Sequence, residues 1–164
     1  MTKMLQSREA PRSEKRGAVG GPHQSERYAS NTRCPKCHLQ YQDGMWKRAN
    51  VGNGADVPSK LCPACMQIRD GQVGGIVEFT GAFAGAHRQE LLNRIKNVEK
   101  QTQEERPLER IIQVKEGKES IIVSATTEHL VARIGKSVQR DFGGELNLRY
   151  APEDKFAYAH WHRD

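Results

Sequence analysis

The hydrophobic and polar positions follow a regular period from about residue 73 onward, and they predict a mixture of strands and helices. Residues 73–81 are rich in β-branched side chains and bounded by glycines, which is typical of a strand. Residues 86–105 follow the period of an amphipathic helix, with charged residues opposite an apolar face. That face consists of Leu91, Leu92, Ile95 and Val98. Pro107 lies just beyond the expected end of this helix.

A hairpin is predicted next. Residues 110–116 and 119–125 are two apolar-rich runs joined by Gly117 and Lys118, as in a short hairpin turn. The third strand of the expected order, residues 119–125, is the most continuously apolar one, which suits a position inside a sheet.

A second helix and two further strands complete the pattern. Residues 126–144 predict a helix that a threonine caps at its start and that Gly143 ends. Its apolar stripe consists of Leu130, Ile134, Val138 and Phe142. Residues 145–151 alternate strictly between polar and apolar, as an edge strand with one solvent-facing side should. Residues 156–162 are expected to return as a last strand after a turn.

This order predicts the fold class α+β, with a ferredoxin-like βαββαβ sheet and one extra C-terminal strand. In that arrangement the first and third strands are central, and the second and fourth lie at the edges. The sheet face turned away from the helices is expected to carry Ile76, Glu78, Thr80, Ile111, Gln113, Ile122 and Ser124. Because this set contains no aromatic residue, we do not expect bases to stack there as they do on RNA-recognition motifs.

The chain divides into three regions. Residues 1–31 lack periodicity and are rich in charged residues, Ser, Gly and Pro, so we expect an arm that is disordered when unbound. Residues 32–71 hold all four cysteines, and residues 72–164 form the α+β domain. Of the net charge of +6, most lies near the N-terminus, since residues 1–33 contain seven Lys/Arg and three Glu. A basic arm suits contact with a polyanion such as nucleic acid, or it merely keeps the protein soluble.

The cysteines form two Cys-Pro-x-Cys pairs, Cys34 with Cys37 and Cys62 with Cys65, separated by 24 residues. Three interpretations compete: a redox-active dithiol, two disulfides, and one metal site. A redox pair normally occurs once, in a thioredoxin-like context, and disulfides need an oxidising compartment. Two short turns that each present two thiolates suit one tetrahedral site, and thiolate donors favour zinc or an iron centre. The gap exceeds the common one of roughly 15–20 residues, but a glycine-rich loop can absorb the difference. We therefore predict a zinc ribbon or knuckle around one structural Zn²⁺.

Three histidines are further candidates for metal ligands. His38 follows Cys37 directly, but the four cysteines already complete a ligand set. His160 and His162 share one side of the expected last strand. That spacing suits a second metal site, or it simply places two histidines at the surface.

The sequence indicates neither a membrane span, nor secretion, nor catalysis. No apolar run approaches the roughly 18 residues of a membrane span, and the N-terminus lacks the apolar centre of a secretory signal. We therefore expect a cytoplasmic protein. The phosphate-binding, metalloprotease and nucleophile-elbow motifs are absent. We expect neither enzyme activity nor a small-molecule substrate.

Two groups of basic residues are candidates for RNA contact. Arg133, Lys136 and Arg140 are spaced three and four residues apart on the second helix, so they share one face suited to phosphate contacts. In the cysteine region, basic residues surround an indole that could stack on a base. This second group consists of Lys36, Trp46, Lys47 and Arg48, with Lys60 further along the chain. The alternative interpretation is a solvated helix face and a tryptophan that covers the zinc knuckle.

The segments CPKC at 34–37, LCPAC at 61–65 and HLVARIGKSVQRDFGGELNLRY at 129–150 together resemble a known group. They are similar to small bacterial zinc proteins related to the Nmd-type adaptor, which exports the large ribosomal subunit in eukaryotes. The resemblance covers residues 34–162 for the bacterial members, and only the cysteine pairs and the helix–strand segment for the adaptor itself. It implies zinc at the four cysteines and contact with the large ribosomal subunit or its RNA. Bacterial members carry names that mention ribosome stability and mRNA decay.

The chain also departs from the adaptor. It has one set of four cysteines where the adaptor has more, and it lacks the adaptor's later domains and export signals. His38 and Met66 follow the two cysteine pairs, where zinc knuckles frequently have glycine. We expect a non-catalytic zinc-binding protein that associates with ribosomes or structured RNA. The alternative is a zinc-knuckle adaptor that docks a protein partner through the knuckle and the sheet edges.

Overall fold

A computed structural model of the chain describes residues 27–48 and 56–164. Most of the expected basic arm, residues 1–26, and the glycine-rich stretch 49–55 lie outside the described residues. The described part of the expected arm already packs on the cysteine region, because the Tyr28 ring contacts the Trp46 ring at a centroid distance of 4.9 Å. The packed cysteine region therefore begins earlier than residue 32.

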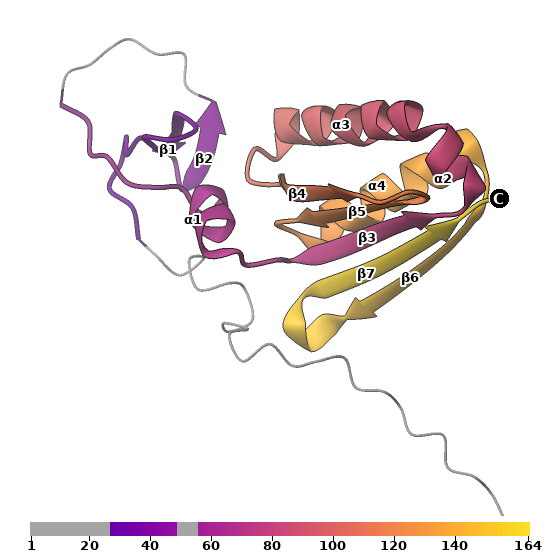
Figure 1. Cartoon of the computed structure of the whole chain (residues 1–164). Coiled ribbons are helices and arrows are strands. Elements are labelled where there is room, and N and C mark those ends of the chain that lie inside the picture. Colours follow the sequence, from indigo (N-terminus) through magenta and orange to yellow (C-terminus); the bar gives the residue numbers. More distant parts are fainter. Residues whose placement is uncertain (1–26, 49–55) are drawn as a thin grey trace, which may run out of the picture.

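The cysteine region folds into a small hairpin and a short helix (Figure 1). The strands are β1 (Leu39–Gln42) and β2 (Met45–Arg48), and the helix is α1 (Pro63–Asp70). Asp43 and Gly44 connect the two strands with φ angles of 53° and 76°. Two positive φ angles in a two-residue connection are typical of a hairpin turn whose twist matches its strands.

The remaining elements form a five-stranded sheet with helices. In chain order they are β3 (Gly75–Thr80), α2 (Ala82–Ala86), α3 (Arg88–Glu105), β4 (Ile111–Glu116), β5 (Ser120–Ala125), α4 (Glu128–Phe142), β6 (Glu145–Ala151), a 3₁₀ turn (Pro152–Asp154) and β7 (Phe156–His162). The prediction of a mixed α+β fold is confirmed, and the two long helices lie where the hydrophobic period placed them. The short helices α1 and α2 were not predicted, since each is too short to show a clear period.

The order of strands in the sheet is β4-β5-β3-β7-β6. β3 and β5 are interior and β4 and β6 are at the edges, as expected. The extra strand β7, however, does not add to an edge of a ferredoxin-like sheet. It lies between β3 and β6, parallel to β3 and antiparallel to β6. β7 therefore occupies the place beside the first strand that the ferredoxin-like order gives to the strand after the second helix.

Both long helices lie along one side of this sheet (Figure 1). Between helices and sheet lies an apolar core whose largest fully buried side chains include Trp161, Phe79, Leu91, Ile95, Ile121, Leu130 and Ile134. α4 contributes most of its length to this core, because its buried positions recur every three to four residues. The opposite face of the sheet carries side chains that are half-buried or exposed.

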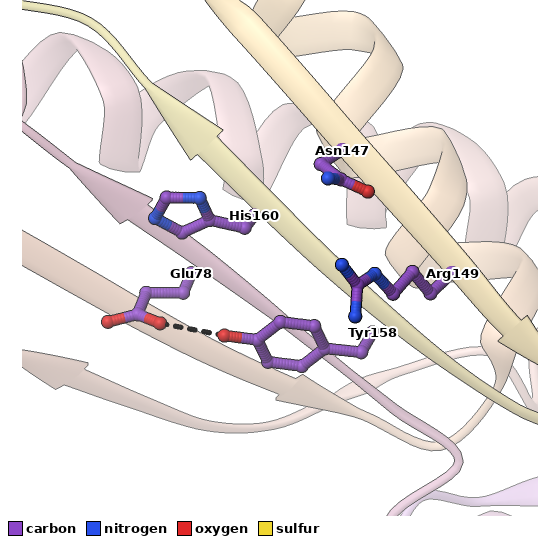
Figure 2. A pocket seen from close by; sticks show the side chains of 5 residues that line it. All are labelled: Glu78, Asn147, Arg149, Tyr158 and His160. Atoms are coloured by element: carbon purple, nitrogen blue, oxygen red, sulfur yellow. Dashed lines mark hydrogen bonds between the residues drawn. The ribbon is translucent and has the colours of Figure 1, made fainter. Parts of the chain in front are cut away.

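The composition of that uncovered face differs from the prediction in two ways. A bulge in β4 shifts the pairing so that Ile111 lies opposite Ala125 and packs against the core, while Gln113 lies opposite Ser124. The expectation of an uncovered face without aromatic rings is also wrong. Because β7 is an interior strand, its outward positions place Tyr158 and His160 on this face, between β3 and β6 (Figure 2).

Candidate metal centre

The first cysteine pair lies in a tight turn before β1. The backbone N–H of Cys34 donates to the carbonyl of Leu39 at 2.8 Å, and that of His38 donates to the carbonyl of Cys34 at 3.0 Å. His38 adopts a φ of 65°, in the left-handed region that favours glycine. His38 thus adopts the left-handed backbone at the position where zinc knuckles frequently have glycine. The His38 side chain is exposed, and it is not part of the group of metal-compatible side chains found in the described residues.

The second pair begins α1. Cys62 is the N-cap of this helix, and its Sγ accepts a hydrogen bond from the backbone N–H of Cys65 at 3.4 Å. Pro63 occupies the first helical turn, where the missing N–H costs nothing. The positive end of the helix dipole favours a negatively charged sulfur at this position.

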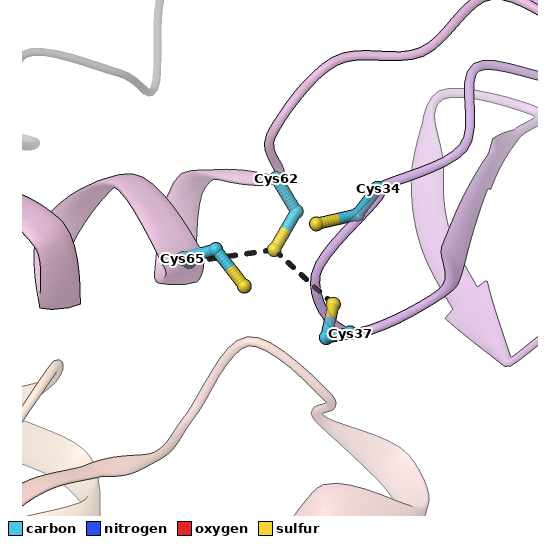
Figure 3. A group of neighbouring side chains, drawn as sticks. All are labelled: Cys34, Cys37, Cys62 and Cys65. Atoms are coloured by element: carbon cyan, nitrogen blue, oxygen red, sulfur yellow. Dashed lines mark hydrogen bonds between the residues drawn. The ribbon is translucent and has the colours of Figure 1, made fainter.

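The two pairs meet, and all four Sγ atoms lie within 4.8 Å of one another (Figure 3). The Sγ atoms of Cys37 and Cys62 are 3.6 Å apart. With a metal–sulfur distance of about 2.3 Å, tetrahedral coordination requires sulfur–sulfur distances of about 3.8 Å. All four cysteines are free, and Cys34, Cys62 and Cys65 are buried. The donor set and its spacing therefore fit one metal ion held by four thiolates.

Arg110 reaches this cluster from the start of β4, a contact that no local sequence signal predicts. Its guanidinium donates to Cys37 Sγ at 3.2 Å and to Cys65 Sγ at 3.3 Å, and a longer contact of 3.9 Å reaches Cys62 Sγ. The same side chain is held at Nε by the carbonyl of Pro107 at 2.9 Å. A divalent ion with four thiolates would have a net charge of −2, and Arg110 would offset part of that charge.

The protonation of the cluster follows from these contacts. The hydrogen bond with the Cys62 thiol, helped by Arg110, lowers the pKa of Cys37 to about 4 in spite of its burial. The pKa of Cys62 is raised, first by its hydrogen bond with Cys37 and second by its burial. Burial opposes the charge of Arg110, yet its bonds to the sulfurs keep the pKa of the guanidinium above its usual value. The cluster therefore already stabilises one thiolate, which is the form that binds metals.

Trp46 does not offer its ring to a base. It is 7% exposed and packs against the rings of Tyr28 and Tyr41, with centroid distances of 4.9 and 5.5 Å. These rings belong to the same buried cluster as the cysteines. The prediction of an indole that stacks on RNA is thus replaced by the alternative interpretation, because the knuckle has too few apolar residues to leave its largest one in solvent.

The basic residues of the knuckle are placed unevenly. Lys36 is exposed within the turn between the first two cysteines, and Arg48 is exposed at the end of β2. Lys47 forms an ion pair with Asp43 at 3.4 Å. Lys60 lies over the Tyr28 ring, with Nζ 5.2 Å from the centroid.

The three basic residues of α4 are all exposed and share the side of the helix that faces away from the core. Arg133 donates to Thr102 Oγ1 of α3 at 3.2 Å, and Arg140 bonds to Asp141 at 3.0 Å. Lys136 has no hydrogen bond or ion pair with any described residue. The row is therefore exposed, but each of its two arginines already has one hydrogen bond to a neighbouring side chain.

His160 and His162 lie side by side, with ring centroids 6.4 Å apart. Both rings bond to the hydroxyl of Thr80, at 3.0 Å and 2.9 Å. Among the described residues, the four cysteines form the one group of three or more side chains with metal-ligand geometry. The two histidines are thus paired through a threonine.

Comparison of the chain with protein-family models, with curated proteins and with solved structures finds no match. No helix in residues 27–48 and 56–164 combines the length and the apolar character that crossing a membrane requires.

Proposed function

We propose that this protein binds one Zn²⁺ at its four cysteines and associates with ribosomal subunits or structured RNA without catalysing a reaction. The metal would be structural, because four protein ligands leave no coordination position for a substrate. The thiolates of Cys34, Cys37, Cys62 and Cys65 would hold it, and Arg110 would stabilise their charge. Thiolate ligands persist in a reducing compartment, which suits a cytoplasmic location.

The observation that carries the RNA part of the proposal is the row of three exposed cations on α4. Arg133, Lys136 and Arg140 project from the outer side of a helix whose inner side is firmly packed, so their backbone positions are fixed relative to one another. A row of cations on such a helix suits the phosphates of a folded RNA and carries no sequence specificity of its own. Lys36 and Arg48 would add contacts from the knuckle. We also propose the relationship to the bacterial proteins related to the Nmd-type adaptor, which rests on the cysteine pairs and the segment 129–150.

The metal part is tested by measuring bound metals in protein purified without added metal. One equivalent of zinc per chain is expected. Iron in place of zinc would keep the four-thiolate site and change the metal, whereas metal-free protein with full solubility would contradict the site.

The RNA part is tested by co-sedimentation of the zinc-loaded, full-length protein with purified ribosomal subunits at low and physiological salt. Reversing the charge of Arg133, Lys136 and Arg140 together should weaken binding. It should also reduce the steepness of the plot of log K against log salt concentration by about 2–3, since each phosphate contact contributes roughly 0.7–0.9 to that slope. The matched control reverses Lys96, Lys100 and Arg106, which are exposed on or just after α3 and change the net charge equally. Equal losses in both variants would show generic attraction to a polyanion and would remove α4 from the interface.

A protein partner is the second candidate, and one observation favours it. Met45 and Val57 are 58% and 37% exposed on the knuckle. Large apolar side chains in solvent are common at protein interfaces. Failure to bind ribosomal subunits at either salt concentration would favour this adaptor function.

A further inference from the structure

The uncovered face of the sheet contains a hollow of about 340 Å³, lined by polar and aromatic side chains (Figure 2). The lining residues come from three adjacent strands: Glu78 from β3, Tyr158 and His160 from β7, and Asn147 and Arg149 from β6. In the strand register, Arg149 lies opposite Tyr158, and His160 has Glu78 on one side and Asn147 on the other. The hollow is therefore built on paired strands, which hold its groups in a fixed relation.

Tyr158 offers an aromatic surface whose position is fixed. The residue is 40% exposed, and its hydroxyl donates to Glu78 Oε2 at 2.9 Å. A ring that is anchored at the sheet by its backbone and at its tip by a carboxylate loses little further entropy when a flat ligand stacks on it. Neighbouring His160 is held through the hydroxyl of Thr80 at 3.0 Å.

The charges of the hollow are not paired with each other. Arg149 and Asn147 have no hydrogen bond or ion pair with any described residue. Glu78 accepts a hydrogen bond from Tyr158 and faces no cation within ion-pair distance among the described residues. A ligand that fits must therefore bring an anion to Arg149, donors to Glu78 and a flat ring to Tyr158.

We infer that this hollow binds one nucleotide of a single-stranded RNA, with its base on Tyr158 and a phosphate at Arg149. A nucleotide combines the required flat ring, base-edge hydrogen-bonding groups and anionic phosphate, and sheet-displayed aromatic rings are a common means of binding single-stranded RNA. The site rests on the proposed function in taking RNA as the partner. It uses the opposite face of the sheet from α4, so it is separate from the row of cations on that helix.

The carboxylate of Glu78 sets the base preference. An ionised carboxylate only accepts hydrogen bonds. Guanine carries two neighbouring N–H donors, N1–H and the N2 amino group, on its Watson–Crick edge, and adenine has an acceptor at N1. The site therefore favours guanine over adenine, and Asn147 can complete the contact as a donor to O6.

The test uses the zinc-loaded, full-length protein and a fluorescent uridine hexamer with one internal guanosine, compared with the same hexamer carrying adenosine. Tyr158→Ala should weaken binding of the guanosine hexamer roughly 5- to 150-fold, the range for loss of one stacked base. Tyr158→Phe keeps the ring and should bind nearly as wild type. Tyr150→Ala is the matched control, because Tyr150 is 52% exposed on neighbouring β6 but is paired with Ala157 on the other face. Glu78→Gln should abolish the preference for guanosine.

Two results would overturn the inference. The first is equal binding by the Tyr158→Ala and Tyr150→Ala proteins. The second is equal affinity for the hexamer and for free guanosine 5′-monophosphate, which would assign the hollow to a free nucleotide instead of RNA. Two-dimensional NMR with guanosine 5′-monophosphate gives an independent readout, since shifts must concentrate on β6, β7 and β3. If the wild-type protein binds the hexamer but not ribosomal subunits, only the proposed function is contradicted. If it binds ribosomal subunits but not the hexamer, only this site is contradicted.

Discussion

Replacing Arg110 with methionine should weaken zinc binding at the proposed site while leaving the sheet folded. Methionine keeps much of the length and apolar character of the arginine stem but removes the two close N–H···S bonds, at 3.2 Å and 3.3 Å, and the positive charge. A hydrogen bond to a charged group contributes about 1.5–3 kcal/mol, so two such bonds set an upper bound of about 3–6 kcal/mol. Arg110 is only partly buried, and water can replace part of the interaction. We therefore expect the usual effect of losing a residue that supports metal ligands, a 10- to 100-fold weaker affinity.

The affinity is measured by competition with a chromophoric zinc chelator at constant pH. Arg106→Met is the matched control, because Arg106 precedes the same strand, pairs with Glu109 at 3.3 Å and has no hydrogen bond to a cysteine sulfur among the described residues. Arg110→Lys should give an intermediate affinity, since lysine keeps the charge but lacks the planar fork that reaches two sulfurs.

A zinc affinity of Arg110→Met within twofold of wild type would refute the reasoning. It would mean that the guanidinium lies beside the sulfurs without stabilising their charge. Circular dichroism of each variant separates this result from a folding defect, because α3 and α4 dominate the helical signal.

Three further substitutions test the packing around the site. His38→Gly should raise the free energy of unfolding of the zinc-loaded protein by about 0.5–1 kcal/mol, because glycine adopts a φ of 65° without strain. Thermal unfolding should then show a higher midpoint, and a lower midpoint would reveal a stabilising contact of the histidine ring. Gly74→Ala should cost about 1–3 kcal/mol in urea unfolding, since a Cβ would lie 2.1 Å from the carbonyl oxygen of Thr126, and an unchanged midpoint would contradict the close approach of these two segments. Trp161→Ala should cost about 3–5 kcal/mol by the same assay, because the indole is fully buried and donates to the carbonyl of Gly143 at 2.8 Å; a loss below about 1 kcal/mol would argue against this core.

The sequence by itself indicated the two long helices, the five strands of the sheet and the four cysteines that cluster. The hydrophobic period of residues 86–105 and 126–144 is local and strong, so both long helices formed where it predicted. The alternation of β6 correctly indicated an edge strand. The two Cys-x-x-Cys pairs predicted one four-sulfur cluster because their geometry depends on short turns, which the flanking residues specify.

Only the tertiary structure decided where β7 lies and what surrounds the cysteines. β7 alternates between the core-facing Ala157, Ala159 and Trp161 and outward polar or aromatic residues, a pattern that fits an edge strand equally well. It is interior because it pairs with β3 and β6 at once, and its polar side stays polar since no described helix covers that face. Arg110 lies 73 residues along the chain from Cys37, and Trp46 is buried by Tyr28 and Tyr41. Contacts across such separations depend on how whole elements pack, and the periodicity of a single segment carries no information about them.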